Sequence, residues 1–337
     1  MHDRFAGRVP AFAAWAQPRT AAVVLALILA PAAAAAQEEG EAEPAPGELE
    51  VDPEAAERAL ERTLTAEGAL LLPRGVVEIE PSVRYERDER DEVFFVRDPT
   101  GAVVDFGEVG VERDETTLAL DARLGLPFDA QIEVGLPFRF VSSERTAVTA
   151  GLGRDPSSAS GNGIGDVTVG VAKTLLREQA WRPDVIARVN WDTATARETD
   201  GDLLLGESFH EVEGSLTLLK RQDPLAFVVS GFYETVFEKD DVDPGDSYGF
   251  GLNAVLAASP ETSLSLGFQQ SFSKDVEVDG RSIPNSGTTQ GVLTLGASSI
   301  LGDGVLLNVT LGVGLDDDAT DYFLRVGLPI RIGRTFF

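Results

Sequence analysis

Hydrophobic and polar residues alternate along most of the chain from residue 75 onward. The alternation is clearest in two neighbouring segments near the C-terminus, 305–315 and 322–332. In the first of these, valine or leucine occupies every odd position, and small or polar residues occupy most even positions. Successive side chains of a strand point to opposite faces, so each segment is predicted to be a strand with one apolar face. Each is also about as long as a tilted strand that crosses a membrane, roughly 9–11 residues.

The same alternation recurs ten more times and predicts twelve strands in all. The connections after even-numbered strands are short, and those after odd-numbered strands are mostly longer, including 87–116 and 142–164. Short turns at one end and long loops at the other are typical of an outer-membrane β-barrel. The predicted strands are 76–86, 117–127, 131–141, 165–175, 184–193, 208–219, 225–237, 247–257, 263–273, 289–297, 305–315 and 322–332.

The predicted fold is therefore an all-β, antiparallel, up-and-down transmembrane barrel whose apolar face contacts lipid and whose polar face lines the lumen. The sheet must close, because an open edge in hydrocarbon would leave backbone groups unpaired. Eight aromatic residues fall at the strand ends that meet the long loops, as an interfacial girdle requires. A soluble β-sandwich or solenoid is the alternative, but it gives no reason for this placement. The eight are Tyr85, Phe140, Trp191, Tyr233, Phe237, Tyr248, Phe272 and Tyr322.

The region before the barrel divides into two parts. Residues 1–36 contain three arginines, a short apolar run and an alanine-rich end, which together predict a cleaved signal peptide. Residues 37–74 form an acidic, Pro- and Gly-rich linker followed by a short helix over 53–64. We interpret this periplasmic helix as a marginal element at the barrel mouth, with a functional plug as the alternative. The barrel itself is expected to span 75–337.

The chain is strongly acidic, with a formal net charge of −28 and no cysteine. Such a charge repels nucleic acid, and the absence of cysteine excludes disulfides and thiol chemistry. The expected location is the outer membrane of a Gram-negative bacterium. The expected partners are outer-membrane lipid and lipopolysaccharide, small-molecule solutes and the barrel-assembly machinery.

The sequence offers little catalytic or metal-binding chemistry. His210 is the single histidine after the signal peptide, and its pairing with Ser208 would be needed for a lipid-degrading barrel enzyme. One such pair is a weak signal, so His210 is interpreted as a rim residue and no catalytic residue is predicted. The acidic runs at 86–92, 238–241 and 316–318 lack EF-hand spacing and are interpreted as solvated loop charge, although divalent ions could bridge them to lipopolysaccharide phosphates. No metal site and no cofactor are expected.

The inward phase of the predicted strands carries charges of both signs. Inward charges in a barrel need partners, so a purely structural role is one interpretation, and lining of a selective passage is the other. The residues predicted to line the pore are Asp121, Arg123, Glu133, Arg139, Asp166, Arg188, Asn190, Asp192, Glu234, Asn308, Arg325 and Arg331.

One stretch, GNGIGDVTVGVAKTLL at 161–176, resembles the Gly-x-Gly-Asp-hydrophobic signature of the outer-membrane family called putative MetA-pathway of phenol degradation. The resemblance extends over 75–337 in layout and is confined to 161–176 in motif. Members are regarded as channels or transporters for small, often hydrophobic molecules. It therefore implies a transport role and does not imply phenol. The matching residues are Gly163, Gly165, Asp166, Val167 and Gly170.

The sequence thus predicts a passive outer-membrane channel for small molecules, hydrophobic or aromatic ones included. A non-conducting structural or surface-interaction barrel is the alternative, and a membrane-embedded lipid enzyme comes third.

The C-terminus has one irregular feature. Phe337 ends the chain in the manner of a barrel-assembly signal, but the outward phase of 322–332 leads to Phe336 instead. Either Gly333 shifts the phase, or the last residues leave the sheet.

Overall fold

The computed structural model describes residues 53–97, 103–149, 153–196, 199–200, 203–204, 209–302 and 304–333. The predicted signal peptide, most of the acidic linker, Ser208 and Phe337 lie outside the described residues. No helix within the described residues combines the length and hydropathy of a membrane span.

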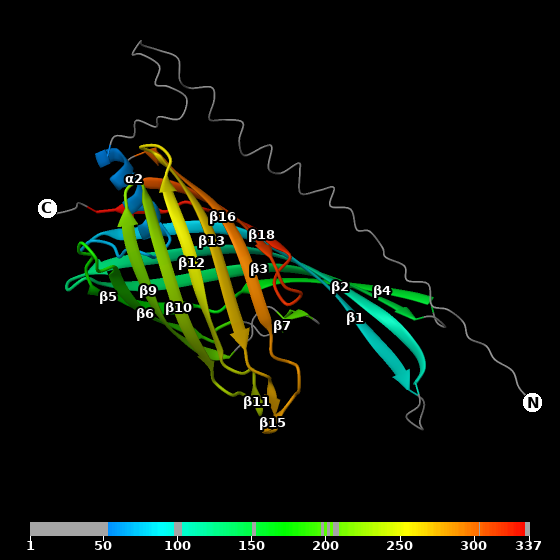
Figure 1. Ribbon diagram of the computed structural model, residues 1–337. Coiled ribbons are helices and arrows are strands. Elements are labelled where there is room, and N and C mark those ends of the chain that lie inside the picture. Colours follow the sequence, from blue (N-terminus) through cyan, green and yellow to red (C-terminus); the bar gives the residue numbers. More distant parts are fainter. Residues whose placement is uncertain are drawn as a thin grey trace, which may run out of the picture. The chain divides into compact units, whose positions relative to one another are not determined.

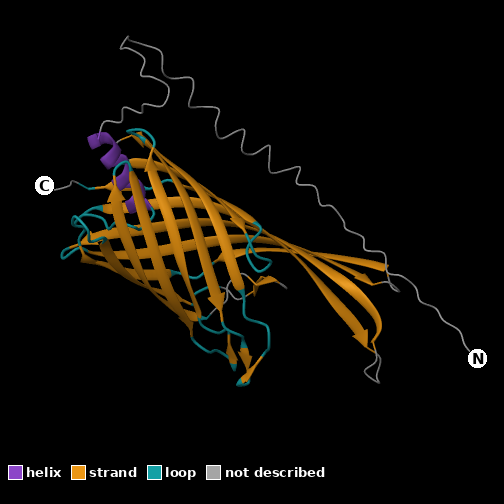
Figure 2. Cartoon of the chain, viewed as in Figure 1, coloured by secondary structure: helices purple, strands orange, loops and turns teal. Residues whose placement is uncertain are grey.

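The described strands form a closed antiparallel barrel with twelve positions in its wall (Figures 1 and 2). Two positions are each shared by two successive strands, since β4 and β5 both pair with β3, and β18 and β19 both pair with β1. The pairing of Val83 with Val326 closes the sheet between its first and last strands. The wall strands are β1 (Val77–Arg97), β2 (Val103–Leu126), β3 (Ala130–Thr149), β4 (Gly153–Ile164), β5 (Thr168–Leu176), β6 (Asp184–Thr193), β9 (His210–Gln222), β10 (Leu225–Val236), β12 (Ser247–Ala257), β13 (Thr262–Ser273), β16 (Thr289–Gly302), β17 (Val305–Gly314), β18 (Tyr322–Gly327) and β19 (Ile330–Ile332).

Further short strands lie at the long-loop end of the barrel. They are β7 (Thr199–Asp200), β8 (Leu203–Leu204), β11 (Val242–Asp243), β14 (Glu277–Val278) and β15 (Arg281–Ser282). The last three pair with one another outside the barrel wall, and β7 pairs with β8.

The predicted twelve-strand barrel is confirmed, but two predicted long loops are wrong. Segments 87–116 and 142–164 are mostly strand, because β1 to β4 continue past the barrel as one antiparallel ladder that we call the arm (Figure 1). The paired extension of β1 from residue 88 to 97, at about 3.3 Å per residue, adds roughly 33 Å. The charged residues of ERDERDE suggested a solvated loop, but this run lies in β1 and pairs with β2 along its whole length, and β2 in turn pairs with β3 from Gly107 onward.

Two further predicted boundaries need correction. The strand expected over 165–175 begins at Thr168, because the chain leaves β4 at Ile164 and is re-aligned against β3 before β5 starts. The last strand is interrupted at Leu328 and Pro329, since proline has no N–H to donate to the ladder. Gly333 lies at a φ of 137°, a conformation that favours glycine, and it ends the described chain.

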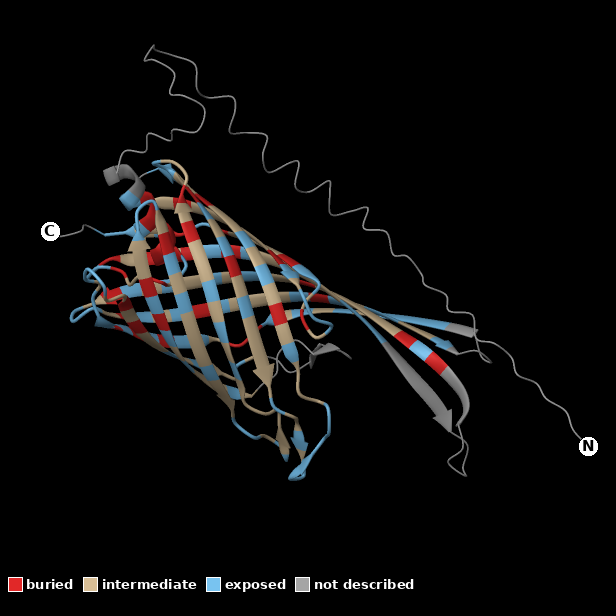
Figure 3. Ribbon diagram, in the orientation of Figure 1, coloured by how far each residue is buried: buried red, intermediate tan, exposed pale blue. Residues whose placement is uncertain are grey.

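The outward face of the wall is a belt of exposed apolar side chains. Leu120, Leu136, Val189 and Leu266 are 45–53% exposed, and other large apolar residues of the wall strands are exposed to a similar degree. Figure 3 shows exposed residues alternating with less exposed ones along the strands. A soluble protein rarely exposes so much contiguous apolar surface, whereas hydrocarbon requires it. The exposed belt and the closed sheet together identify a transmembrane barrel.

The predicted aromatic girdle is confirmed at the long-loop end. Tyr233 is opposite Tyr248, and Tyr248 is opposite Phe272, so these three rings form a row across β10, β12 and β13. The Tyr248 and Phe272 rings are stacked with their centroids 5.5 Å apart. Tyr85 and Tyr322, at the closing seam, have ring centroids 6.2 Å apart. These rings mark the outer interface of the membrane.

Candidate functional site

Residues 57–72 form a plug that closes part of the barrel at its short-turn end. This segment contains most of helix α2 (Pro53–Ala66) and the turn that follows it. Leu64 is fully buried and Leu60 is 2% exposed, and they pack against wall residues. Burying each leucine stabilises the docked state by about 1.5–3 kcal/mol. The wall residues in this cluster are Leu219, Ala226, Val255 and Ala257, on β9, β10 and β12.

Polar side chains of the wall hold the C-terminal end of the plug. Arg123 donates from Nη1 to the carbonyl oxygens of Thr65 and Ala66, each at 3.1 Å, and Arg188 donates from Nη2 to Gly68 O at 3.0 Å. The last carbonyls of a helix lack intrahelical partners and carry partial negative charge, so guanidinium groups are suited to them.

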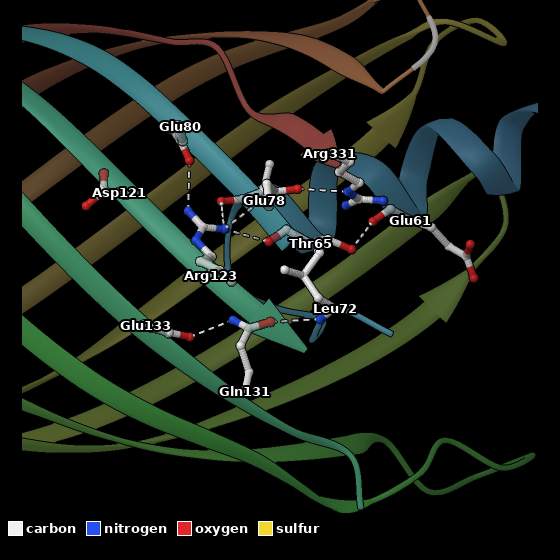
Figure 4. Close-up of polar contacts among 12 residues, drawn as sticks. Glu61, Thr65, Leu72, Glu78, Glu80, Asp121, Arg123, Gln131, Glu133 and Arg331 are labelled. Carbon is white, nitrogen blue, oxygen red and sulfur yellow. Dashed lines mark hydrogen bonds and ion pairs between the residues drawn. The ribbon is translucent and has the colours of Figure 1, made fainter. Parts of the chain in front are cut away.

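Two amide side chains complete the polar docking. The backbone N–H of Leu72 donates to Gln131 Oε1 at 2.8 Å (Figure 4). Asn253 donates from Nδ2 to Glu67 Oε2, also at 2.8 Å. The interpretation of the helix as a marginal element at the mouth is therefore wrong, because its far end is bound inside the lumen by residues from β2, β3, β6 and β12.

A charge network on β1 supports the plug. The side chains of Glu78 and Glu80 are 1% and 4% exposed, and Arg123 binds both, at 3.3 and 2.8 Å (Figure 4). Arg331 binds Glu78 at 2.8 Å, and Arg325 binds Glu80 at 3.0 Å. Buried charges are tolerated when they are paired and hydrogen-bonded, as these are. The network thus fixes Arg123 in the orientation that reaches the plug.

Above the plug the lumen contains two adjoining cavities of about 500 and 440 Å³. Glu67, Gly68, Arg188, Glu213 and Arg325 line both of them, so the cavities meet at the tip of the plug.

The two cavities differ in chemistry. Charged residues of β2, β3, β6 and β9 dominate the larger cavity. The smaller cavity is lined mainly by short hydroxyl-bearing side chains and glycines, together with the Phe232 ring. Its hydroxyl-bearing residues are Ser215, Thr217, Ser230, Ser265, Thr294 and Thr310.

Most of the residues predicted to line the pore meet in the larger cavity. The side chain of Arg188 is 3.1 Å from that of Glu133, and Arg325 is 3.7 Å from Asp121. Arg331 lies below, beside the plug, and Asn308 lines a small side cavity next to Glu67. The eight in the larger cavity are Asp121, Arg123, Glu133, Arg188, Asn190, Asp192, Glu234 and Arg325.

The other two predicted residues lie where the arm joins the barrel. Arg139 is 3.5 Å from the buried carboxylate of Glu115. Asp166 precedes β5, and its Oδ1 accepts a hydrogen bond from Ala196 N at 2.7 Å. A side chain at Gly165 would approach Pro137 to 2.9 Å, so glycine allows the chain to pass close to β3 here. The Gly-Asp motif therefore shapes the transition from arm to wall.

Several important lumen residues were absent from the predicted set. Glu78, Glu80 and Gln131 have the same inward phase as residues that were included, so the alternation alone could have identified them. Glu213 is inward on β9 and directly opposite Glu234 on β10. Glu67 could not be found this way, because it belongs to the plug and its position depends on docking.

The geometry described above agrees with comparisons to known proteins. Residues 65–332 match the family described as Putative MetA-pathway of phenol degradation. The protein belongs to this family. The match begins at Thr65, whose carbonyl accepts the Arg123 hydrogen bond, so the family region includes the end of the plug as well as the barrel.

Several solved structures are similar to this member of the MetA-pathway family. An outer membrane channel from Pseudomonas putida F1 is 17% identical with a TM-score of 0.57, covering 78% of this chain and 97% of its own. The translocator domain of the autotransporter NalP from Neisseria meningitidis gives 12% and 0.44, with 84% and 98% covered. The toluene transporter TbuX of Ralstonia pickettii gives 10% and 0.41, with 77% and 90% covered. The first of these shares the fold, and the fold places this protein in an outer membrane.

Proposed function

We propose that the protein is a passive outer-membrane channel for small molecules that carry polar groups. The observation that carries this proposal is the pair of adjoining cavities, about 500 and 440 Å³, inside the closed barrel wall. Their lining is charged or hydroxyl-rich, and it can replace part of the hydration shell of a polar solute. Aromatic solutes with hydroxyl groups fit the same lining, since Phe232 offers one ring face beside several hydroxyls.

The test is conductance of the purified, folded protein in planar bilayers, together with swelling of liposomes in isosmotic solutions of small sugars. We expect discrete conductance steps and solute-dependent swelling. Complete absence of both, in protein whose folding is verified by heat-modifiable migration, would overturn the proposal.

The alternative is a non-conducting barrel, and the docked plug is the observation that favours it. Arg123 and Arg188 hold the plug carbonyls across the lumen, which narrows any passage at the short-turn end. The conductance of the protein with and without its plug distinguishes the two functions. A channel conducts with its plug in place, whereas a sealed barrel conducts only when the plug is removed.

The remaining parts of the proposal concern export and surroundings. Cleavage of residues 1–36, insertion by the barrel-assembly machinery and contact with lipopolysaccharide all follow from an outer-membrane role. Catalysis is not part of the proposal. The ring of His210 lies against the girdle residue Trp191, with centroids 5.8 Å apart, which suits a rim residue. His210→Ala should therefore leave lipid hydrolysis unchanged from background.

A further inference from the structure

Two of the arginines that line the larger cavity, Arg123 and Arg188, bind the plug and are engaged there. Arg123 bonds two plug carbonyls and binds Glu78 and Glu80. Arg188 bonds a plug carbonyl and binds Glu133. Each of these guanidinium groups is therefore matched locally by negative charge or carbonyl oxygen. Their contribution to the field further up the lumen is small.

Carboxylates dominate the other end of the larger cavity. Glu213 and Glu234 are directly opposite one another on β9 and β10, at the height of the aromatic girdle. Asn190 donates from Nδ2 to Glu213 Oε1 at 3.5 Å, and Ser247 donates from Oγ to Glu234 Oε1 at 2.7 Å. These donors are uncharged, so they hold the two carboxylates without neutralising their charge. Like charges placed directly opposite on a sheet repel, and a passing cation relieves that repulsion.

The larger cavity as a whole also carries an excess of negative charge. Among the residues that the structure describes, seven carboxylates and three guanidinium groups line it. Charges that line one cavity are separated by distances comparable with the Debye length of about 8 Å at physiological salt, so such an imbalance is only partly screened and concentrates ions of opposite charge. Anions meet the same field as a barrier before they reach the arginines.

Resting on the channel role proposed above, we infer that the lumen passes cations in preference to anions, and that Glu213 and Glu234 set this preference at the outer mouth. The class of solute is then cationic, such as small amines and guanidines, together with neutral polar molecules. Small carboxylates and phosphates are excluded. The smaller, hydroxyl-lined cavity supplies hydrogen-bond partners for the uncharged part of such a solute.

The test is the reversal potential of the full-length protein in a planar bilayer under a KCl gradient. The wild-type protein should reverse near the potassium equilibrium potential. Glu213→Gln and Glu234→Gln should each lower the potassium-to-chloride permeability ratio several-fold, and the double variant should lower it further. The matched control is Glu112→Gln, which removes the same charge from the arm, outside the lumen.

The outcomes separate the inference from the channel role. A wild-type channel that conducts but prefers chloride, or is unselective, overturns the inference and leaves the channel role intact. Equal loss of selectivity in the Glu112→Gln control assigns the effect to the overall charge of the protein and also overturns it. Absence of conductance in the wild type overturns the channel role instead. Because the wild-type measurement needs no substitution, a variant that fails to fold leaves the inference open to refutation.

Discussion

At the scale of single residues, Arg123 links the wall to the plug. Its side chain is 15% exposed and it binds Glu78 and Glu80, which are nearly inaccessible. Arg123→Gln should lower the free energy of unfolding by about 3 kcal/mol, because removing one partner of a buried charge network leaves the others uncompensated. The value lies at the low end of such effects, since Arg331 and Arg325 still bind the two glutamates. Urea unfolding in detergent micelles or lipid vesicles measures it.

The control for this substitution is Arg177→Gln. Arg177 also pairs with a carboxylate, Asp129 at 2.7 Å, but both side chains are more than half exposed, in two separate short turns. Exposed pairs contribute about 0–1 kcal/mol, so this variant should unfold almost as the wild type does. Equal destabilisation by the two substitutions would show that the burial of Arg123 has no energetic consequence.

A second residue-scale prediction concerns pH. Asp246, in the loop before β12, accepts hydrogen bonds from Lys274 Nζ at 2.6 Å and from Tyr233 Oη at 2.7 Å. These bonds, first that of Lys274, lower the pKa of the Asp246 carboxyl from its ordinary 3.8 to about 2. Because the folded-state pKa is depressed, the stabilising contribution of the contact is complete above about pH 4 and is lost as pH falls through about 2.

Lys274→Met should raise the pKa of Asp246 toward its ordinary value, since the strongest donor is removed. A carboxyl-carbon NMR titration of aspartate-labelled protein measures this change. The reference is Lys220→Met, which removes a lysine that pairs with Glu178 in a different turn. An Asp246 titration that is identical in Lys274→Met and wild-type protein would contradict the assignment.

For single residues, the sequence predicted well whether a side chain points inward or outward, but it predicted poorly which residues that side chain contacts. Arg325 and Glu133 point inward as their phase requires, because a strand leaves each side chain only two directions. The height at which two inward residues meet depends on the register between strands. The register between β9 and β10 brings Glu213 opposite Glu234. The alternation within one strand carries no information about that register.

At the scale of elements, the plug is the feature that the sequence left open. Leu64→Asp should expel it, because an ionised carboxylate cannot be buried against the apolar cluster of wall residues. We expect a barrel that still folds and migrates heat-modifiably, with higher single-channel conductance than the wild type. The matched control is Arg58→Asp at an exposed helix position, which should leave conductance unchanged. Unaltered conductance in Leu64→Asp would show that the plug does not narrow the passage.

The arm gives a second prediction at the same scale. β2 lies between β1 and β3 along the arm, so Glu112→Pro removes a ladder hydrogen bond from a strand that is paired on both sides. Trypsin should then cut at Arg113, which the intact ladder protects. Conductance should be retained, since the barrel below is unchanged. Rapid cleavage at Arg113 in the wild-type protein would mean that the arm is open in solution.

The arm was missed because charge outweighed pattern in the interpretation of its sequence. Runs such as ERDERDE lack an apolar face, and the prediction of a strand relied on one. Outside the lipid belt a strand needs no such face, since pairing with neighbours satisfies its backbone and water solvates its side chains. Arg87, for example, binds Glu112 across the ladder at 2.7 Å.

At the scale of the whole molecule, the barrel was predictable because hydrocarbon imposes strict conditions on any strand that crosses it. β6 and β12 begin and end where the alternation placed them, at 184–193 and 247–257. The contents of the lumen obey no comparable rule. The docking of α2 depends on residues brought together from β9, β10 and β12, and none of these contacts is local in sequence.

The docked plug also determines the order in which the protein can assemble. Glu67 and Asn253, which hydrogen-bond to each other, are 186 positions apart, and the loop they close can form only after the intervening strands have paired. The segment that leaves the ribosome early is therefore seated late. Until then the helix must remain soluble without the barrel, and exposed charged residues such as Glu57, Arg58 and Glu61 favour its solubility. In this chain the plug is synthesised before the barrel strands but takes its folded position after them.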